Sequence, residues 1–182
     1  MTLDDLIDWV APEVAGAMKA TIRSQLVLTM RELCDNANVW LERIDVYVPK
    51  GLQEAELDAP ENGEVLRVVS VDNMREGDYE QPVPHAIRFA QKATEARRHS
   101  VSVACRPVLT AKELPTALER WAEALMFGAL YRLMRMPDQK WSNPALSSHY
   151  QTLYFAQQSE AARLGNVGHH KAVRQVKRRP FV

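Results

Sequence analysis

The spacing of apolar residues divides the chain into helical regions on either side of a β-rich region. From Pro12 to Leu33, apolar side chains recur every three or four residues, which is the spacing of one face of an α-helix. We therefore expect a helix over residues 12–36, stopped by Asp35 and Asn36, whose side chains compete for backbone hydrogen bonds. A short amphipathic opening precedes this helix.

The pattern then changes from helical spacing to alternation. Residues 44–48 alternate apolar with polar side chains, residues 65–71 are rich in β-branched side chains, and residues 101–105 alternate again. Because turn-forming residues separate these runs, we predict a β-rich insertion over about 42–109, either a short antiparallel sheet or a set of hairpins. The stretch 85–99 fits either a helix or an irregular edge, and we favour the helix.

Helical spacing returns with an apolar face wide enough to be buried between other helices. Thr110 and Glu113 have the spacing of a capping box, although Pro115 equally fits the first turn of a slightly later start. We predict a central core helix over residues 111–136.

A last helix is expected to complete the body. Asn143 and Pro144 have the residue types of an N-cap and a first helical position, and Gly165 is a natural stop, so the helix should cover 144–164. The predicted fold is mainly α with a small β module (α+β): a bundle of about three to four helices, a short antiparallel sheet or hairpins, and an extended C-terminal arm. Residues 1–165 should form a single domain.

The net charge of zero conceals an uneven distribution along the chain. The predicted arm, residues 166–182, has five basic side chains and no acidic one. Removing these five from the total of 23 leaves 18 basic against 23 acidic side chains, so residues 1–165 have a net charge of about −5. This asymmetry indicates a tail with its own partner. The side chains expected to dock are Lys171, Val173, Arg174, Val176, Lys177, Arg178, Arg179, Phe181 and Val182.

A search for catalytic and cofactor-binding motifs finds no pattern typical of an enzyme. The sequence has no phosphate-binding glycine loop, no nucleophile elbow and no zinc-protease motif. Cys34 and Cys105 are far apart, so we expect buried thiols, and the adjacent His169 and His170 favour a solvated pair over a metal site. The tryptophans fit core packing better than stacking on nucleic acid. We therefore expect no catalytic residue, no metal, no cofactor and, since no apolar run is long enough, no membrane span.

The region 115–164 resembles the C-terminal half of adaptor proteins from the head-to-tail connectors of tailed phages. In that family a helix containing a Gly-Ala-Leu segment leads through a Pro-containing turn and a Trp to a capped, long final helix. The pattern does not extend to residues 74–100. The elements that carry the resemblance are Gly128-Ala129-Leu130, Met136-Pro137, Trp141 and Asn143-Pro144, with Ile22-Arg23, Leu33-Cys34 and Trp40 nearer the N-terminus and a basic ending, 173–182.

The resemblance implies a structural virion protein in the neck between capsid and tail, made in the host cytoplasm. About twelve copies would form a ring below the portal protein, with the arm inserted between portal subunits and a tail nozzle or tail tube protein beneath. Genomic DNA would pass through the ring without specific binding. An arm of about 15 extended residues spans roughly 50 Å, enough to reach a neighbouring subunit.

Two other interpretations of the basic tail remain open at this stage. The first is a nucleic-acid-binding module that uses the tail as a sequence-independent phosphate clamp. The second is a solvated terminus without a partner, since charge runs at chain ends are often only that. An undetected enzyme would need polar groups converging in a pocket, which the spacing does not supply.

Overall fold

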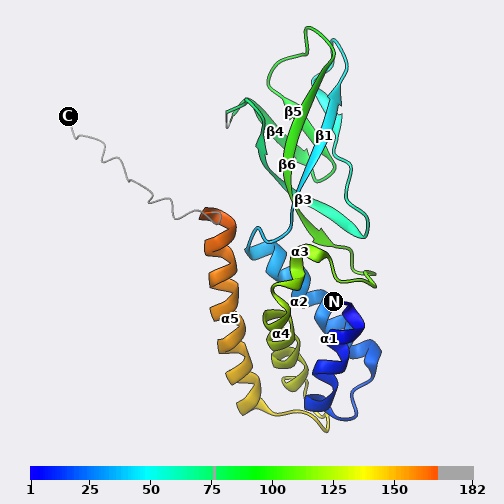
Figure 1. Cartoon of the computed structure of the whole chain (residues 1–182), viewed down its shortest axis with the longest axis vertical. Coiled ribbons are helices and arrows are strands. Elements are labelled where there is room, and N and C mark those ends of the chain that lie inside the picture. The colour runs from blue at the N-terminus through cyan, green and yellow to red at the C-terminus, as the bar shows by residue number, and fades with distance from the viewer. Residues whose placement is uncertain (76, 168–182) are drawn as a thin grey trace, which may run out of the picture.

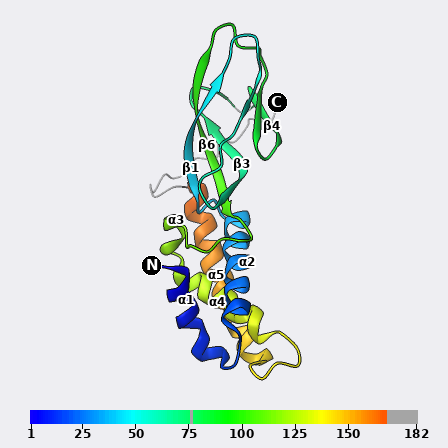
Figure 2. The ribbon, with the colours of Figure 1, turned by 90° about the vertical axis from the view of Figure 1, so that its right-hand side faces the viewer.

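The chain folds into two lobes joined end to end. The computed structural model describes residues 1–75 and 77–167. All of the described helices lie in one lobe, the helical lobe, and all of the described strands in the other, the β lobe, as Figure 1 shows. Figure 2, turned by a quarter, shows the same elongated arrangement with the β lobe beyond one end of the helices. The β lobe is an insertion in the chain between the second and third α-helices.

The helical lobe is built around three longer helices and three shorter elements. Its elements are α1 (Leu3–Val10), the 3-10 turn η1 (Ala11–Val14), α2 (Lys19–Asn36), α3 (Thr116–Glu119), α4 (Ala122–Met134) and α5 (Pro144–Val167). Thr2 starts α1 through a reciprocal capping box with Asp5, which satisfies backbone donors that a helix start leaves open. α1 then buries Leu3, Leu6 and Ile7 in the core.

Helix α4 lies between α2 and α5, and a glycine sets how close the three helices come. A Cβ atom added at Gly128 would lie 2.3 Å from Thr29 Cγ2 of α2 and 3.0 Å from the ring of Tyr154 of α5. Ser147 of α5 is buried, and its hydroxyl donates to the carbonyl of Tyr131 of α4 at 2.8 Å. This close packing makes the three helices one layered unit.

The β lobe contains two antiparallel sheets of three strands each. One sheet has the order β1-β6-β3 and the other the order β2-β5-β4. The strands are β1 (Leu41–Val48), β2 (Glu54–Glu56), β3 (Gly63–Val71), β4 (Tyr79–Val83), β5 (Ala86–Phe89) and β6 (Arg97–Pro107).

The alternation of side chains explains how the sheets pack. On β6, Val101 and Val103 are fully buried, while the serines beside them are partly exposed. Ile87 and Phe89 of the other sheet are buried too, and the Phe89 ring lies 4.8 Å from the His99 ring of β6, centroid to centroid. The apolar core of the β lobe therefore lies between the two sheets, and it is continuous with the core of the helical lobe.

The expected architecture, a helical bundle with a small β module, is wrong. The described residues form a mixed α+β fold in which the strands build two complete sheets, and the helices do not form a clear bundle. α1 has eight residues and α3 four, so only α2, α4 and α5 are long. The reason is that the inserted region buries enough apolar surface between its own sheets to be a lobe comparable with the helical one.

Several predicted element boundaries also need correction. The helix expected over 85–99 is absent: its first part is β5 and its last part begins β6. The helix expected over 12–36 begins only at Lys19, because η1 and Gly16, at φ +96°, interrupt the chain before it. The helix expected over 111–136 is divided into α3 and α4. The last helix continues through Gly165 to Val167 instead of stopping at 164.

Candidate interaction sites

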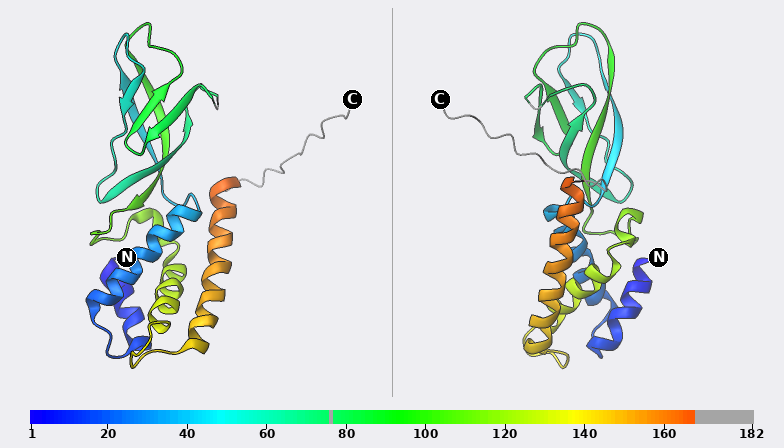
Figure 3. Two further views of the ribbon diagram at one scale, coloured as in Figure 1. Left: turned by 180° about the vertical axis from the view of Figure 1, so that it is seen from behind. Right: turned by 60° about the vertical axis from the view of Figure 1, so that its left-hand side comes forward.

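The predicted docking residues of the arm lie outside the described residues, but the place from which the arm leaves the body is described. Those nine side chains are Lys171, Val173, Arg174, Val176, Lys177, Arg178, Arg179, Phe181 and Val182. A Cβ atom added at Gly165, in the last turns of α5, would lie 3.1 Å from the backbone N and O of Asn38, in the connection from α2 to β1. The C-terminal end of α5 therefore lies at the waist between the lobes (Figure 3).

A network of ion pairs fixes the two lobes to each other at this waist. We call Arg31, Asp35, Glu64 and Arg106 the waist network. Glu64 of β3 accepts hydrogen bonds from Arg31 of α2 at 2.7 Å and from Arg106 of β6 at 2.6 Å. Arg106 also pairs with Asp35 of α2 at 3.0 Å. Burial by itself would raise the pKa of Glu64, but the hydrogen bonds from Arg106 and Arg31 outweigh it, so the pKa is lowered.

The helical lobe has exposed apolar side chains on two opposite flanks. Figures 1 and 3 show α1 and α5 on opposite sides of α2 and α4. Trp9 of α1 is 51% exposed, while Leu146 and Phe155 of α5 are 41% and 43% exposed. Between Pro144 and Ser159, α5 has no Asp, Glu, Lys or Arg. Large exposed apolar side chains next to uncharged surface are typical of protein interfaces.

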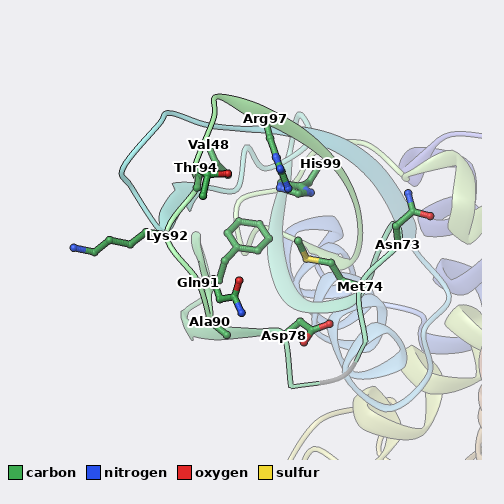
Figure 4. A pocket seen from close by; sticks show the side chains of 12 residues that line it. Val48, Asn73, Met74, Asp78, Ala90, Gln91, Lys92, Thr94, Arg97 and His99 are labelled. Atoms are coloured by element: carbon green, nitrogen blue, oxygen red, sulfur yellow. The ribbon is translucent and has the colours of Figure 1, made fainter.

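The β lobe has an open cavity of about 410 Å³ next to its far end. Its apolar lining comes from Val48, Met74 and Phe89, and polar groups of Asp78 and Arg97 lie beside them. Figure 4 shows Arg97 next to His99, and the side chain of Lys92, also a lining residue, extending away from the cavity. Burial and the neighbouring Arg97 lower the pKa of His99, so its imidazole is uncharged at pH 7.

Two loops meet at the end of the β lobe farthest from the helices. The loop after β1 and the loop after β5 are joined by backbone hydrogen bonds from Gly51 N to Ala93 O, at 2.7 Å, and from Ala93 N to Leu52 O, at 2.8 Å. Both loops lie at the end of the β lobe in Figure 1. Tyr47 and Leu52 are exposed here by 57% and 53%.

This end of the β lobe also gathers cations that form no salt bridge with a described residue. We call them the tip cations: Lys50, Lys92, Arg97 and Arg98. Within the described part of the chain none of them forms a salt bridge, whereas Arg31, Arg43, Arg88, Arg106 and Arg132 all do. The sequence analysis did not identify the tip cations as a site, because Lys50 is far from the others in sequence. The available signal was that two turn regions of the β-rich insertion both contain basic residues.

Three side chains that can carry chemistry, two cysteines and a tryptophan, are buried in the described structure. Cys34 and Cys105 are buried as expected, and burial raises the pKa of each thiol to about 12, so neither is a thiolate nucleophile at neutral pH. Trp121 is buried in the core, in agreement with the packing role expected for it. In residues 1–75 and 77–167 there is no group of three or more His, Cys, Asp or Glu that is placed to hold a metal ion.

Two further comparisons concern membranes and relatives. Of the helices described, none is both long and apolar enough to cross a bilayer. No protein-family model matches the sequence, and no curated protein is significantly similar to it.

Proposed function

We propose that this chain is a structural adaptor of a tailed-phage neck, which forms a ring between the portal protein and the tail and has no catalytic activity. The observation that carries the proposal is the position of the α5 C-terminus. The helix ends at the waist, against Asn38, and the basic residues 168–182 follow it. A docking segment that starts from a fixed point on a body is the arrangement an adaptor needs.

The distribution of charge and apolar residues supports docking of this segment on a neighbouring protein. Residues 168–182 contain five basic side chains and no acidic one, so an acidic crevice on a partner would select this segment by complementary charge. Val173, Val176 and Phe181 supply apolar side chains for pockets, and main-chain pairing with a partner strand adds affinity. Many arms engaging around one ring offset the entropic cost of ordering each.

The two flanks of the helical lobe support the ring. A ring of identical subunits needs two different surfaces on opposite sides of each subunit, because each interface is heterologous. The α1 flank with Trp9 and the α5 flank with Phe155 meet this requirement. The waist network keeps the lobes in one relative orientation, so every subunit presents the same geometry.

The remaining parts of the proposal follow from the family resemblance. The ring has about twelve copies, a tail nozzle or tail tube protein attaches beneath it, and the assembled protein is located in the virion neck. Genomic DNA passes through the channel, and an acidic body disfavours adhesion of the duplex because like charges repel.

Mixing the purified protein with portal rings of its own phage tests the proposal by electron microscopy. Three forms are compared: the full chain, a chain that ends after Val167, and a full-length chain with Lys177→Glu, Arg178→Glu and Arg179→Glu. We expect an added ring below the portal with the full chain and much reduced occupancy with both altered forms. Circular dichroism should show that both altered forms keep a folded body.

Each outcome of this experiment decides part of the proposal. Failure of the full chain to add a ring to the portal would overturn the adaptor role. Rings that form equally well without residues 168–182 would overturn the docking role of the arm. Salt-sensitive binding to DNA in place of portal binding, lost on truncation, would instead favour a nucleic-acid-binding module.

A further inference from the structure

The tip of the β lobe brings together exposed apolar side chains, a cavity and cations that form no salt bridge with a described residue. We propose that this tip is a docking site for an acidic segment of a partner protein, which inserts one apolar side chain into the cavity and pairs its carboxylates with the tip cations. This inference goes beyond the proposed adaptor role and does not depend on it. In an adaptor, the tip would be a docking surface separate from the arm.

The register of the strands and loops places the tip cations around the cavity. Arg97 lies opposite Val48 in the pairing of β6 with β1, and Arg98 lies opposite the exposed Tyr47. Lys92 and Arg97 line the cavity itself. Lys50 precedes Gly51, whose backbone is bonded to the loop that contains Lys92. The cations therefore come from two loops and one strand, β6, which meet at one end of the lobe.

Because no described acidic residue pairs with these cations, they are available for a ligand. Cations that are already paired within a protein must lose those pairs to bind another anion, whereas the tip cations keep no salt bridge with any described residue. His99 beside Arg97 is uncharged at pH 7, so it neither repels nor neutralises a ligand there. All four tip cations are exposed to solvent.

The cavity supplies a place for an apolar anchor. Its volume of about 410 Å³ is within the usual range of ligand pockets. Val48, Met74 and Phe89 form apolar parts of its lining, next to the cationic ones. An apolar side chain buried in a pocket and surrounded by polar contacts is the usual arrangement of an interface hot spot.

The surroundings of the tip favour an acidic protein segment over a nucleic acid. Asp45 and Asp72 border a second hollow together with Arg97 and Arg98, and Asp78 lines the cavity, so a continuous row of phosphates would meet carboxylates. A peptide can place its acids only where the cations are. Exposed Leu52 also gains more from contact with apolar protein groups than from contact with a phosphate backbone.

Fluorescence anisotropy of a labelled peptide tests the proposal with the full chain. The probe is a short peptide of Glu and Ser with one central Phe. The comparison ligands are the same peptide with Phe replaced by Ser, a peptide with Lys in place of Glu, and a short DNA duplex. All are measured at one moderate salt concentration, because charge-dependent binding weakens as salt rises.

The protein variants separate the tip from general charge effects. Lys92→Glu with Arg97→Glu reverses two tip cations, and Thr94→Trp puts a bulky side chain on the lining of the cavity. The matched control is Lys112→Glu with Lys140→Glu, two exposed lysines outside the β lobe that also have no salt bridge among the described residues. The arm is the same in all of these proteins, so differences among them report on the tip.

We expect the Glu-Phe peptide to bind the unaltered chain, and the charge reversal to weaken binding by about tenfold, since several exposed charge contacts are lost and replaced by repulsion. Thr94→Trp and removal of the Phe should each weaken binding several-fold, and the control should bind like the unaltered chain. No binding of the peptide, tighter binding of DNA, equal weakening by the control, or binding that ignores both Phe and Thr94→Trp would each overturn the proposal.

Discussion

The waist and the tip of the β lobe use charged residues in opposite ways. At the waist and among the helices, several arginines are paired: Arg132 with Glu32, Arg23 with Asp4, and Arg31 with Glu64. At the far end of the β lobe, the tip cations have no such partners among the described residues. Paired charges fix a structure, whereas unpaired charges are free to bind. The comparison supports the proposal that the tip of the β lobe is a surface for recognition.

The lobes should nevertheless unfold together, and this expectation gives the largest predicted effect. Ile87 of the β lobe and Leu125 of the helical lobe are both fully buried in one continuous core. Ile87→Ala and Leu125→Ala should each lower the free energy of unfolding by about 2–5 kcal/mol. Urea unfolding followed by circular dichroism and by tryptophan fluorescence should give coincident transitions for each variant. A helical lobe that keeps its normal midpoint in Ile87→Ala would show that the lobes are independent.

The close packing at Gly128 should make this position of the helical lobe intolerant of a larger side chain. Gly128→Ala places a methyl group against Thr29 Cγ2 and the Tyr154 ring, and Thr29 cannot easily rotate because its hydroxyl donates to the carbonyl of Gln25. We expect a loss of about 2 kcal/mol in unfolding free energy despite the better helix propensity of Ala.

A second substitution checks the cause of that loss. Adding Thr29→Ser removes the methyl group nearest the new Cβ atom, so the double variant should regain much of the stability lost by Gly128→Ala. If the effects of the two substitutions on the free energy of unfolding simply add, the contact with Thr29 is not the cause of the loss.

The waist network should contribute a smaller amount to the free energy of unfolding, and this amount should depend on pH. Because the pKa of Glu64 is lowered in the folded chain, its contribution is present above its ordinary pKa of 4.5 and is lost as the pH falls through the lower folded value. Glu64→Gln should cost about 1 kcal/mol at neutral pH, a modest amount because Glu64 is partly exposed. Melting temperatures of the two proteins should converge in acid. Glu61→Gln, at an exposed residue, is the control.

The exposed flanks should affect assembly while leaving stability almost unchanged. Trp9→Ser and Phe155→Ser alter exposed side chains, so the unfolding free energy should change by no more than about 0.5 kcal/mol. Ring formation on portal particles should decrease for both. Leu109→Ser changes another exposed apolar residue, in the loop between β6 and α3, and should assemble normally. Normal rings with both flank variants would place the subunit interface elsewhere.

The sequence predicted the helices flanking the β region better than the β region itself. The period of three and four identified α2, α4 and α5 because their buried faces are long enough to show it. The helical period gave a wrong prediction at residues 85–99. Strand β5 is only four residues long, so the alternation of buried Ile87 and Phe89 with partly exposed neighbours is too short to distinguish from a helix. Gly165 suggested a helix stop, but it lies within α5, where the lack of a side chain allows the helix to approach the backbone of Asn38 closely.

The interaction surfaces were only partly predictable for a different reason. A basic run such as 171–179 is visible in sequence because its members are adjacent. The tip cations become neighbours only when β6 pairs with β1 and the loops bearing Lys50 and Lys92 are joined by backbone hydrogen bonds. Tertiary structure creates this cluster, so the basic residues of the two turn regions are only a weak local signal for it. The cavity beside it depends on packing between two sheets and is invisible in sequence.

The pairing of β1 with β6 brings together the two chain segments that connect the β lobe to the helices. These strands connect the β lobe to the helices, and they pair from Leu41 with Ala104 to Val48 with Arg97. The points where the chain enters and leaves the lobe are therefore neighbours, so residues can be added or removed beyond them without moving α2 or α4. The helical scaffold and the tip loops can therefore be altered separately, which makes these loops the part to exchange when a different partner is wanted.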